Sequence, residues 1–499
     1  MDSNSTDLML FNKIHYGRQD IVLDYDEVTP DNVIEVMQKA LPIHAQNRKD
    51  CEYLIKYFLG DQDILYRQGS YTSEINNKTV VNYAFPITRQ IVGYTFAGGI
   101  ELVQKDMNKK EAVNKLSDYY SYENAYYVDI CTGIYNSICG VGYQITLPNN
   151  MITKDNTPDI PFVYEALDPR DTFVVKSSAI GHPQIMSCII GTTKDRRKLY
   201  TIYTDKYRFT IVAMDKRTLT TINNPIGIDP ITMIENSLFL TGDWEQAISV
   251  MNASNMVASD ALNDIESTIK ALLVVIGAEF DDSDGEQADI KKVKKNRILT
   301  LTSQTGTNLD AKFISSNLDS TSVQNIRDYL EDARNVITGI PDRSANSSGG
   351  DTGTAVLNRD GWTDIEIVAR LKELFFKKGK KKQLAVGIKI LQMLDLIDND
   401  LKVLDVEPVI GRHTTDNLST KTTAFSTLVA TGELATIDCL ELSGLTNKTR
   451  EMVERGEQAK KKRQEEAIKT NNQNGNNPND NKNNDDKNNK VVNNTTNKN

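Results

Sequence analysis

The stretch that decides the fold is TGDWEQAISVMNASNMVASDALNDIESTIKALLVVIGAEF, Thr241–Phe280. Ten of its residues follow one another at alternating intervals of four and three, and nine of them are apolar: Trp244, Ile248, Met251, Asn255, Ala258, Leu262, Ile265, Ile269, Leu272 and Ile276. This heptad seam predicts one long helix over 243–276, which begins at Asp243 and ends before Gly277. By itself the seam is typical of a buried core helix or a dimeric coiled coil.

A second long helix is predicted over 319–340. The seam spacing recurs in Val323, Ile326, Leu330, Ala333 and Ile337, and Gly339-Ile340-Pro341 ends the helix. The interval 277–318 carries an acidic run and then a basic run that includes Lys291, Lys292, Lys294 and Lys295. Two short strands, in RILTLTSQTG and AKFISS, are predicted after the basic run. A small α/β tip therefore joins the two helices.

The segment 341–353 is rich in Ser and Gly and has no aliphatic residue larger than Ala345, so it predicts an exposed, mobile loop. A third long helix is predicted over 354–398, with bends or breaks at its internal glycines. Five lysines cluster around Gly379, as on a solvated face or at a phosphate contact: Lys377, Lys378, Lys380, Lys381 and Lys382.

The two ends of the chain have different character. Residues 1–160 are predicted to be mainly helical, with helices over Asp31–Ala40, over Arg48–Leu59 and within Val80–Ile100. Residues 161–234 are predicted to form a small antiparallel β unit with hairpins, because β-branched and aromatic residues alternate with turns there.

Shorter helices, among them Leu418–Thr431, are predicted within 399–470. Fifteen of the 29 residues in 471–499 are Asn, which predicts a disordered tail. The fold class is α+β, mainly helical.

The charge of the chain restricts its function. Lys and Arg total 58, Asp and Glu total 68, and the net charge is −10. A protein that holds duplex DNA tightly needs a basic excess to displace phosphate counterions. The balance fits an ordinary acidic protein, or one that lets a polyanion pass without adhering to it.

The search for catalytic and membrane motifs is negative. The four histidines lack metal-ligand spacing, and the sequence has no HExxH, GxSxG, CxxC or phosphate-binding P-loop motif. We therefore expect no enzyme activity, no cofactor and no metal. The longest apolar run, Ala271–Ala278, is far shorter than the ~20 residues of a membrane-spanning helix.

Several strings, in their order along the chain, resemble the portal proteins of tailed bacteriophages. VVNYAFPITRQIVGYTFAGGIEL, Val80–Leu102, is similar to the family's N-terminal wing segment, and Asp168-Pro169-Arg170 to its "DPR, then strand" element. Thr241–Glu266 is similar to the first stem helix. Gly339–Asp342, the Ser/Gly loop and Thr354–Leu357 resemble the tunnel loop and the start of the long kinked helix. Here that start reads Thr-Gly-Thr-Ala, whereas family members usually show Ser-Gly-x-Ala.

The resemblance implies a portal-type, ring-forming fold. Its parts would be a wing (1–242, β-rich over 161–234), two stem helices (243–276 and 319–340), a clip (277–318), a tunnel loop (341–353), a long kinked helix (354–398), a crown (399–470) and a disordered tail (471–499). The implied function is a homo-oligomeric ring, commonly of twelve copies, at one capsid vertex. The ring would form the channel for packaging and ejection of double-stranded DNA.

The resemblance also implies partners and site residues. Partners would be further copies of the chain, the DNA in transit, the terminase motor, the head-tail adaptor, and capsid and scaffold proteins, in a virion assembled in the host cytoplasm without a membrane. Ring packing is assigned to the seam residues Trp244, Ile248, Met251, Leu262, Ile265 and Ile269. The DNA-channel loop would use Arg343, Ser344, Asn346, Ser347 and Asp351, and the adaptor-facing clip Lys291, Lys292, Lys294 and Lys295.

Two other classes of protein remain open from the sequence. An oligomeric coiled-coil scaffold or structural virion protein without a DNA channel would explain the heptads, but not the β unit or the loop between long helices. An enzyme of unfamiliar motif would require turnover by the purified protein alone.

Overall fold

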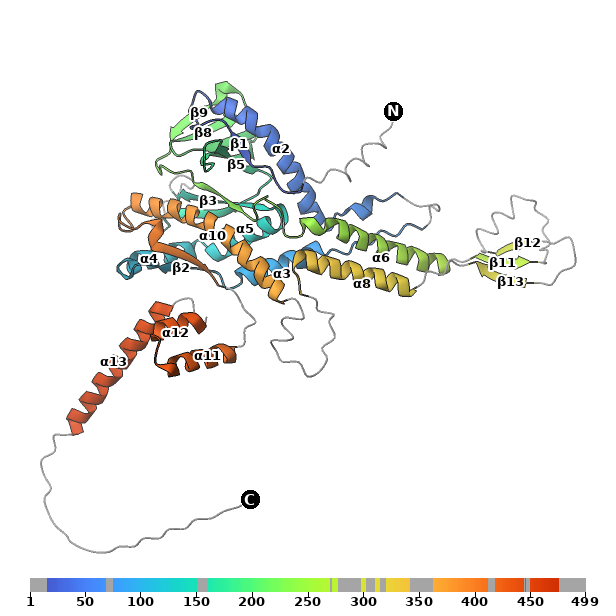
Figure 1. Ribbon diagram of the computed structural model, residues 1–499. Coiled ribbons are helices and arrows are strands. Elements are labelled where there is room, and N and C mark those ends of the chain that lie inside the picture. The colour runs from blue at the N-terminus through green and yellow to red at the C-terminus, as the bar shows by residue number, and fades with distance from the viewer. Residues whose placement is uncertain are drawn as a thin grey trace, which may run out of the picture. The chain divides into compact units, whose positions relative to one another are not determined.

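The computed structural model of the chain (Figure 1) describes residues 16–68, 75–149, 160–269, 272–276, 298–301, 310–314, 320–341, 362–411, 418–443, 445 and 449–474. The chain forms two compact units, Met1–Thr414 and Thr415–Asn499. Among the described residues, the first unit holds the four sheets and the helices up to Met393, and the second holds three helices. The α+β class predicted from the sequence is confirmed.

A six-stranded sheet lies in the first unit, in the order β1-β5-β6-β7-β8-β9. The strands are β1 (Ile21–Leu23), β5 (Thr172–Ser177), β6 (Gln184–Thr192), β7 (Lys198–Tyr203), β8 (Tyr207–Val212) and β9 (Thr220–Asn223). All pairs are antiparallel except β1 with β5. The hairpins predicted within 161–234 are thus confirmed, because β-branched and aromatic residues alternate across this sheet.

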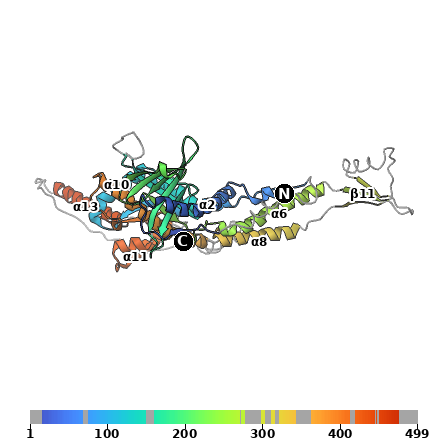
Figure 2. The ribbon, with the colours of Figure 1, turned by 90° about the horizontal axis from the view of Figure 1, so that it is seen from above.

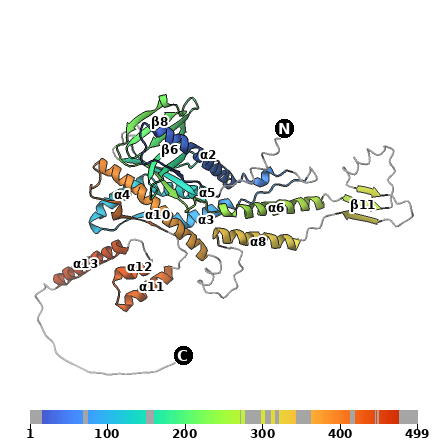
Figure 3. The same cartoon turned by 45° about the horizontal axis from the view of Figure 1, so that its top comes forward.

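Helix α2 (Val33–Phe58) packs on the six-stranded sheet (Figure 3). Its residues Val33, Val36 and Met37 share a core with Phe173 and Ile202. The sequence predicted two helices here, over Asp31–Ala40 and Arg48–Leu59, but the structure has one helix that continues past Pro42. Burial of the apolar face on both sides of the proline accounts for this continuity.

A second sheet joins β10 (Ile231–Glu235), β3 (Val141–Pro148) and β4 (Phe162–Leu167), all antiparallel. Strand β3 follows helix α5 (Ala125–Cys139) after Gly140, whose φ of 77° turns the chain in a way that favours glycine. All eight residues of β3 are buried. The prediction of a mainly helical segment to residue 160 missed this strand, since a fully buried strand shows no alternation of polar and apolar residues.

Further described elements of the first unit are strands β2 and β14, three helices and five short 3₁₀ helices. Strand β2 (Ile100–Gln104) pairs with β14 (Val406–Ile410), some 300 residues later. The helices are α3 (Ala84–Phe96), α4 (Lys110–Tyr122) and α10 (Trp362–Met393). The short 3₁₀ helices are η1 (Asp63–Tyr66), η2 (Met107–Lys109), η4 (Lys216–Thr218), η5 (Glu245–Ala247) and η6 (Val403–Asp405). Helix α3 confirms the helix predicted within Val80–Ile100.

The seam helix is shorter than predicted. Helix α6 covers Ile248–Ile269, and Leu272–Ile276 form strand β11. The prediction of one helix over 243–276 is therefore wrong. The segment LLVVI has three β-branched residues, and β11 pairs on one side with β12 (Ile298–Leu301) and on the other with β13 (Asp310–Ile314). Strands β12 and β13 confirm the two short strands predicted within 277–318.

Helix α8 (Ser320–Thr338) confirms the second long helix predicted over 319–340. Helices α6 and α8 lie side by side, as the views in Figures 1 and 2 agree. Gly339, with φ 66°, ends α8, and the added Cβ of any other residue would meet Val368 on α10.

Helix α10 does not break at its glycines as predicted, since it is continuous from Trp362 to Met393. Gly379 instead allows close packing on β10. A Cβ at this position would lie 2.7 Å from Ile234 Cγ1 and 3.2 Å from Ile234 Cα. Gly379 therefore permits a close approach between α10 and β10 and is not a hinge.

Changing Gly379→Ala should destabilise the protein by roughly 1–3 kcal/mol, because the strand backbone has to move. This is opposite in sign to the ~1 kcal/mol that alanine contributes to an open helical site. Urea unfolding measures the effect. Gly93→Ala on α3 is the control, since no atom lies within 4 Å of its added Cβ, and it should stabilise. Equal effects of the two changes would contradict the packing argument.

The second unit contains α11 (Leu418–Thr431), α12 (Thr436–Ser443) and α13 (Thr449–Asn474). Helix α11 has the predicted bounds. The predicted boundary at 399 is wrong, because β14 pairs with β2 in the first unit and the units divide at 414/415. The tail boundary at 471 is also wrong, since α13 continues to Asn474. Residues 475–499 lie outside the described residues.

Candidate assembly surface and channel elements

The first half of the α6 seam is core of its own chain. Trp244, Ile248 and Met251 are fully buried and share a cluster with residues of α2, α3 and α5. The Trp244 ring stacks on Tyr57 with centroids 5.5 Å apart, and its Nε1 donates to Thr88 Oγ1 at 3.0 Å. Side chains with no accessible surface cannot contact a second copy. This corrects the assignment of these three residues to ring packing.

The second half of the seam is open. Leu262 and Ile265 are exposed, so the structure leaves these two predicted ring-packing residues available to a neighbour. The side chain of Ile269 lies outside the described set. A dimeric coiled coil through the whole seam, the alternative left open by the sequence, is excluded because its first half is occupied by the chain itself.

A polar column on α6 binds an extended segment, 75–82. The backbone N–H groups of Asn77, Thr79 and Val81 donate to Asn263 Oδ1, Ser259 Oγ and Asn255 Oδ1, at 2.7, 2.9 and 2.7 Å respectively. Every second residue of the segment meets every fourth residue of the helix, because two extended residues span ~6.6 Å and four helical ones ~6 Å. Asn255, the one polar member of the seam, therefore binds backbone of its own chain, and this side of α6 is covered.

Helix α8 has its apolar side turned away from its own chain. Val336 is 81% exposed and Tyr329 is 71% exposed, and Ile326 and Ile337 on the same side are also exposed. The side that faces the chain is polar, with Arg334, Asn335 and Thr338 all buried. A surface helix of a monomer shows the reverse arrangement, with its apolar stripe facing inward. The stripe Ile326, Tyr329, Val336 and Ile337, here called the α8 stripe, is the strongest candidate for an assembly surface.

The sequence found part of the α8 stripe. The heptad spacing identified Ile326 and Ile337, but it missed Tyr329 and Val336, the two most exposed members. These two residues are seven positions apart, so they form a second apolar row beside the predicted seam. That row was the signal in the sequence that could have identified them. The inward polar residues could not be assigned from spacing, because a polar face is ordinarily solvated.

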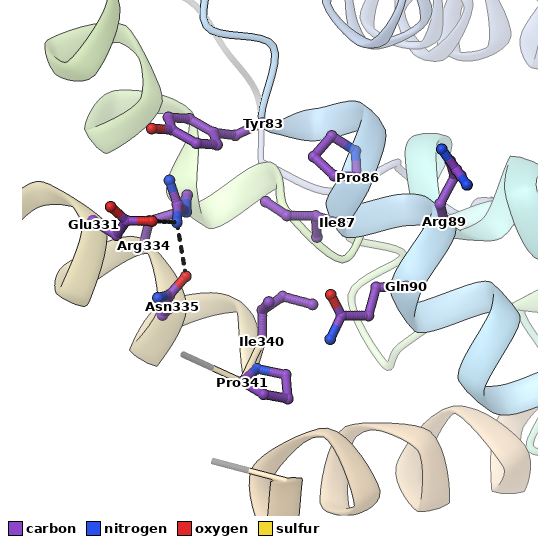
Figure 4. A pocket seen from close by; sticks show the side chains of 10 residues that line it. All are labelled: Tyr83, Pro86, Ile87, Arg89, Gln90, Glu331, Arg334, Asn335, Ile340 and Pro341. Atoms are coloured by element: carbon purple, nitrogen blue, oxygen red, sulfur yellow. Dashed lines mark hydrogen bonds and ion pairs between the residues drawn. The ribbon is translucent and has the colours of Figure 1, made fainter. Parts of the chain in front are cut away.

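A groove lies on the inward side of α8, between that helix and α3 (Figure 4). Its volume is about 620 Å³. It is lined by Tyr83, Pro86, Ile87, Arg89, Gln90, Glu331, Arg334, Asn335, Ile340 and Pro341. Arg334 Nη2 donates to Glu331 Oε1 and to Asn335 Oδ1, both at 2.9 Å, and its guanidinium lies 3.7 Å from the Tyr83 ring centroid. The groove therefore combines apolar walls with two arginines, and hydrogen bonds within the groove hold Arg334 in place.

The lysines near Gly379 bind carboxylates of their own chain. Lys377 pairs with Glu373, Lys378 with Glu235, and Lys381 with Glu407, at 2.6, 2.8 and 2.9 Å. Burial lowers the pKa of Lys382, with the neighbouring Lys378 acting in the same direction. Lys378 and Lys382 are exposed and Lys377 and Lys381 are half-buried, so four of the five lysines reach the surface, as a solvated face predicts. Three of these four are paired with carboxylates, so they are not a row of free cations that could hold a phosphate.

Lys380 is the buried member of this cluster. Its Nζ donates to both oxygens of Asp129, at 2.8 and 3.0 Å, and to Tyr164 Oη at 2.8 Å. Asp129 Oδ1 also accepts from Gln144 Nε2 at 2.9 Å and from Tyr164 Oη at 2.7 Å. Burial lowers the pKa of Lys380, and Asp129 opposes that shift. This network fixes α10 to α5 and to the second sheet.

The other predicted site residues lie outside the described part of the chain. These are the channel-loop residues Arg343, Ser344, Asn346, Ser347 and Asp351, and the tip lysines Lys291, Lys292, Lys294 and Lys295. Within the described part, no cluster of three or more His, Cys, Asp or Glu residues could hold a metal. None of the helices in that part is both long and apolar enough to cross a bilayer.

Comparison with known proteins adds a family match. The family model described as "Phage portal protein, SPP1 Gp6-like" matches residues 38–469. No curated protein matches the chain.

The solved structures with similar chains include two particle necks. One is from the neck of an empty GTA particle computed with C6 symmetry, at 13% identity over 80% of this chain and 94% of that one, with a TM-score of 0.44. The other is from the neck of a native GTA particle computed with C12 symmetry, at 11% identity over 74% and 91%, with a TM-score of 0.42. Neither likeness is close enough to carry an argument about assembly or function.

Proposed function

This chain belongs to the SPP1 Gp6-like family of phage portal proteins, whose model covers residues 38–469, and we propose that it acts as a closed ring of twelve copies held together through the α8 stripe. It is a viral portal protein, a structural component of the particle that forms the channel for its DNA. The number of copies in the ring, the residues that pack between copies and the binding partners are our proposals.

The observation that supports this proposal is the reversed polarity of α8. Four large apolar side chains of the α8 stripe face solvent in the isolated chain, while polar side chains are buried behind them. Each such side chain stabilises by ~1.5–3 kcal/mol when it is removed from water. A neighbouring copy that covers the stripe gains this free energy, and the exposed Leu262 and Ile265 on α6 extend the surface.

Changing Val336→Glu should prevent ring formation or weaken the contact between copies at least tenfold, since it places a carboxylate in an apolar interface. Native mass spectrometry and negative-stain microscopy measure the oligomer. Leu404→Glu is the matched control, because Leu404 is 77% exposed but lies on η6, away from the stripe. Wild-type protein that stays monomeric at micromolar concentration, or rings that tolerate Val336→Glu as well as Leu404→Glu, would refute the assignment.

We propose that segment 341–353 lines the channel, with Arg343, its only cation, touching the DNA backbone, and Ser344, Asn346, Ser347 and Asp351 beside it. The support is the resemblance of this segment to the family's tunnel loop. The pairing of Lys377, Lys378 and Lys381 within the chain agrees with a channel that does not hold DNA tightly.

Changing Arg343→Glu should leave the ring intact and impair packaging or retention of DNA, because a phosphate contact becomes a repulsion. Particle yield and the length of protected DNA measure the effect. Arg197→Glu serves as the matched control, because Arg197 is an exposed arginine in the turn between β6 and β7. If Arg343→Glu particles retained full-length DNA normally, the assignment of this loop to the channel would be wrong.

The tip lysines Lys291, Lys292, Lys294 and Lys295 are proposed to face the head-tail adaptor, with terminase, capsid and scaffold proteins binding elsewhere on the ring. Paired acidic and basic runs suit a partner of complementary charge. Lysine-directed crosslinking within assembled particles tests this. If these lysines crosslinked only to proteins inside the head, the tip would face the head interior and not the tail, opposite to this proposal. The virion is assembled in the host cytoplasm in this proposal.

A further inference from the structure

The groove between α3 and α8 contains a buried donor without an acceptor. Arg334 is 6% exposed, and its Nη1 has no hydrogen-bond partner among the described residues. Nη2 already donates to Glu331 and Asn335, so the guanidinium is held in place and cannot turn to satisfy Nη1 from within. An unsatisfied buried donor is costly, most of all on a charged group. The groove therefore lacks one acceptor.

The groove and the α8 stripe lie on different sides of the same helix. Residues five apart in a helix are ~140° apart around its axis. Arg334 is five residues after Tyr329, and Glu331 is five residues before Val336, so the groove-lining pair lies across the helix from the exposed pair. A ring with a rotational axis needs two different, complementary surfaces on each copy. A concave surface and a projecting apolar one are present here.

We propose that Tyr329 of a second copy enters this groove, and that its hydroxyl oxygen accepts a hydrogen bond from Arg334 Nη1. This inference rests on the proposed ring and names its contact. The volume of about 620 Å³ admits an aromatic ring together with a neighbouring aliphatic side chain such as Val336. Pro86, Ile87 and Ile340 supply apolar walls for them (Figure 4).

A phosphate is the competing occupant, and the local charges disfavour it. The Glu331 carboxylate is 2.9 Å from Arg334 Nη2, so it already neutralises that guanidinium and would repel an anion beside Nη1. The second arginine of the lining, Arg89, lies over the Phe85 ring, 5.5 Å from its centroid, and not in the Arg334–Glu331 pair. A tyrosine hydroxyl is uncharged and meets no such repulsion. Its ring also buries apolar surface against the groove walls, whereas a phosphate needs water or donors on all its oxygens.

Cysteine pairing tests the contact in the full chain. Tyr329→Cys combined with Gln90→Cys should give, on mild oxidation, a ladder of disulfide-linked oligomers that ends at the ring size. Neither single variant should exceed the wild-type background, which is set by the native thiols, four of them buried and Cys131 half-buried. The matched control pairs Gln90→Cys with Tyr122→Cys, an exposed tyrosine on α4, and should give no ladder.

Microscopy of the same samples separates the two proposals. Rings without a ladder would overturn the Tyr329 contact and leave the ring proposal intact, whereas the absence of rings from wild-type protein would refute the ring proposal itself. Intact rings of Arg334→Gln that lose binding to a short DNA duplex, with no ladder from the cysteine pair, would assign the groove to phosphate instead.

A separate variant tests the hydrogen bond that the Tyr329 hydroxyl is proposed to accept. Tyr329→Phe keeps the ring side chain and removes the acceptor, so the dissociation constant between copies should rise about tenfold, as for a hydrogen bond to a charged group. Tyr122→Phe should leave that constant unchanged. A Tyr329→Phe protein that assembles as tightly as wild type would overturn the bond to Arg334.

Discussion

Lys380→Met will destabilise the first unit by about 3–5 kcal/mol, because it leaves the Asp129 carboxylate buried without its cation. Both side chains are almost fully buried, with only 3% and 4% of their surface exposed. Gln144 and Tyr164 still donate to Asp129 after the change, but neutral donors do not replace the charge. Urea unfolding at matched protein concentration measures the loss.

The same helix provides the control for this prediction. Lys378→Met also removes an ion pair, with Glu235 at 2.8 Å, but the Lys378 side chain is largely exposed, so the loss should stay below ~1 kcal/mol. Adding Asp129→Asn to Lys380→Met should recover much of the stability, since the amide oxygen still accepts from Gln144 and Tyr164. If Lys380→Met costs no more than Lys378→Met, the buried pair does not hold α10 in place.

Glu245→Ala will have an effect of similar size at the start of α6. The Glu245 carboxylate is fully buried, and it accepts from Arg18 Nη2 at 2.5 Å and from the backbone N–H groups of Gly17 and Gly242, both at 2.8 Å. Removing it takes the carboxylate away from a buried guanidinium, which costs about 3–5 kcal/mol. Two backbone donors lose their acceptor as well, unless water enters the space.

Fluorescence of the neighbouring Trp244, which is fully buried, follows this unfolding. Glu111→Ala serves for comparison, because Glu111 is exposed and only 3.5 Å from Lys115 in a surface pair, and it should change stability little. A small effect of Glu245→Ala, with the signal of Gly17 and Arg18 unchanged in hydrogen exchange, would show that the N-terminal segment is held by other contacts.

The buried ion pairs illustrate a limit of sequence reasoning. Lys380 stands among four other lysines, and nothing in their spacing distinguishes the buried one from its neighbours. Its partner Asp129 is 251 positions away, and only the packing of α10 against α5 brings them together. Glu245 is likewise one acid among 68, and its partner Arg18 is 227 positions away.

Local sequence was sufficient wherever one element decides its own structure. The hairpins of 161–234, the helix within Val80–Ile100, helix α8, helix α11 and strands β12 and β13 follow from periodicity, turn residues and propensity. The order of motifs from Val80 to Leu357 also indicated the portal family, which the family model confirms. These signals depend on residues that are close together in the sequence, so they can be recognised without knowledge of tertiary contacts.

Tertiary structure decided where each apolar face points. One seam on α6 runs into the core at Trp244 and into solvent at Ile265, because packing against α2, α3 and α5 covers only its first half. The run Leu272–Ile276 fits the helical spacing but becomes a strand, because β12 and β13 satisfy its backbone on both sides. The sequence by itself determined the hairpins, several of the helices and the family. The reversed polarity of α8 and the groove at Arg334 arose only in the fold, because burial depends on partners far away in the chain.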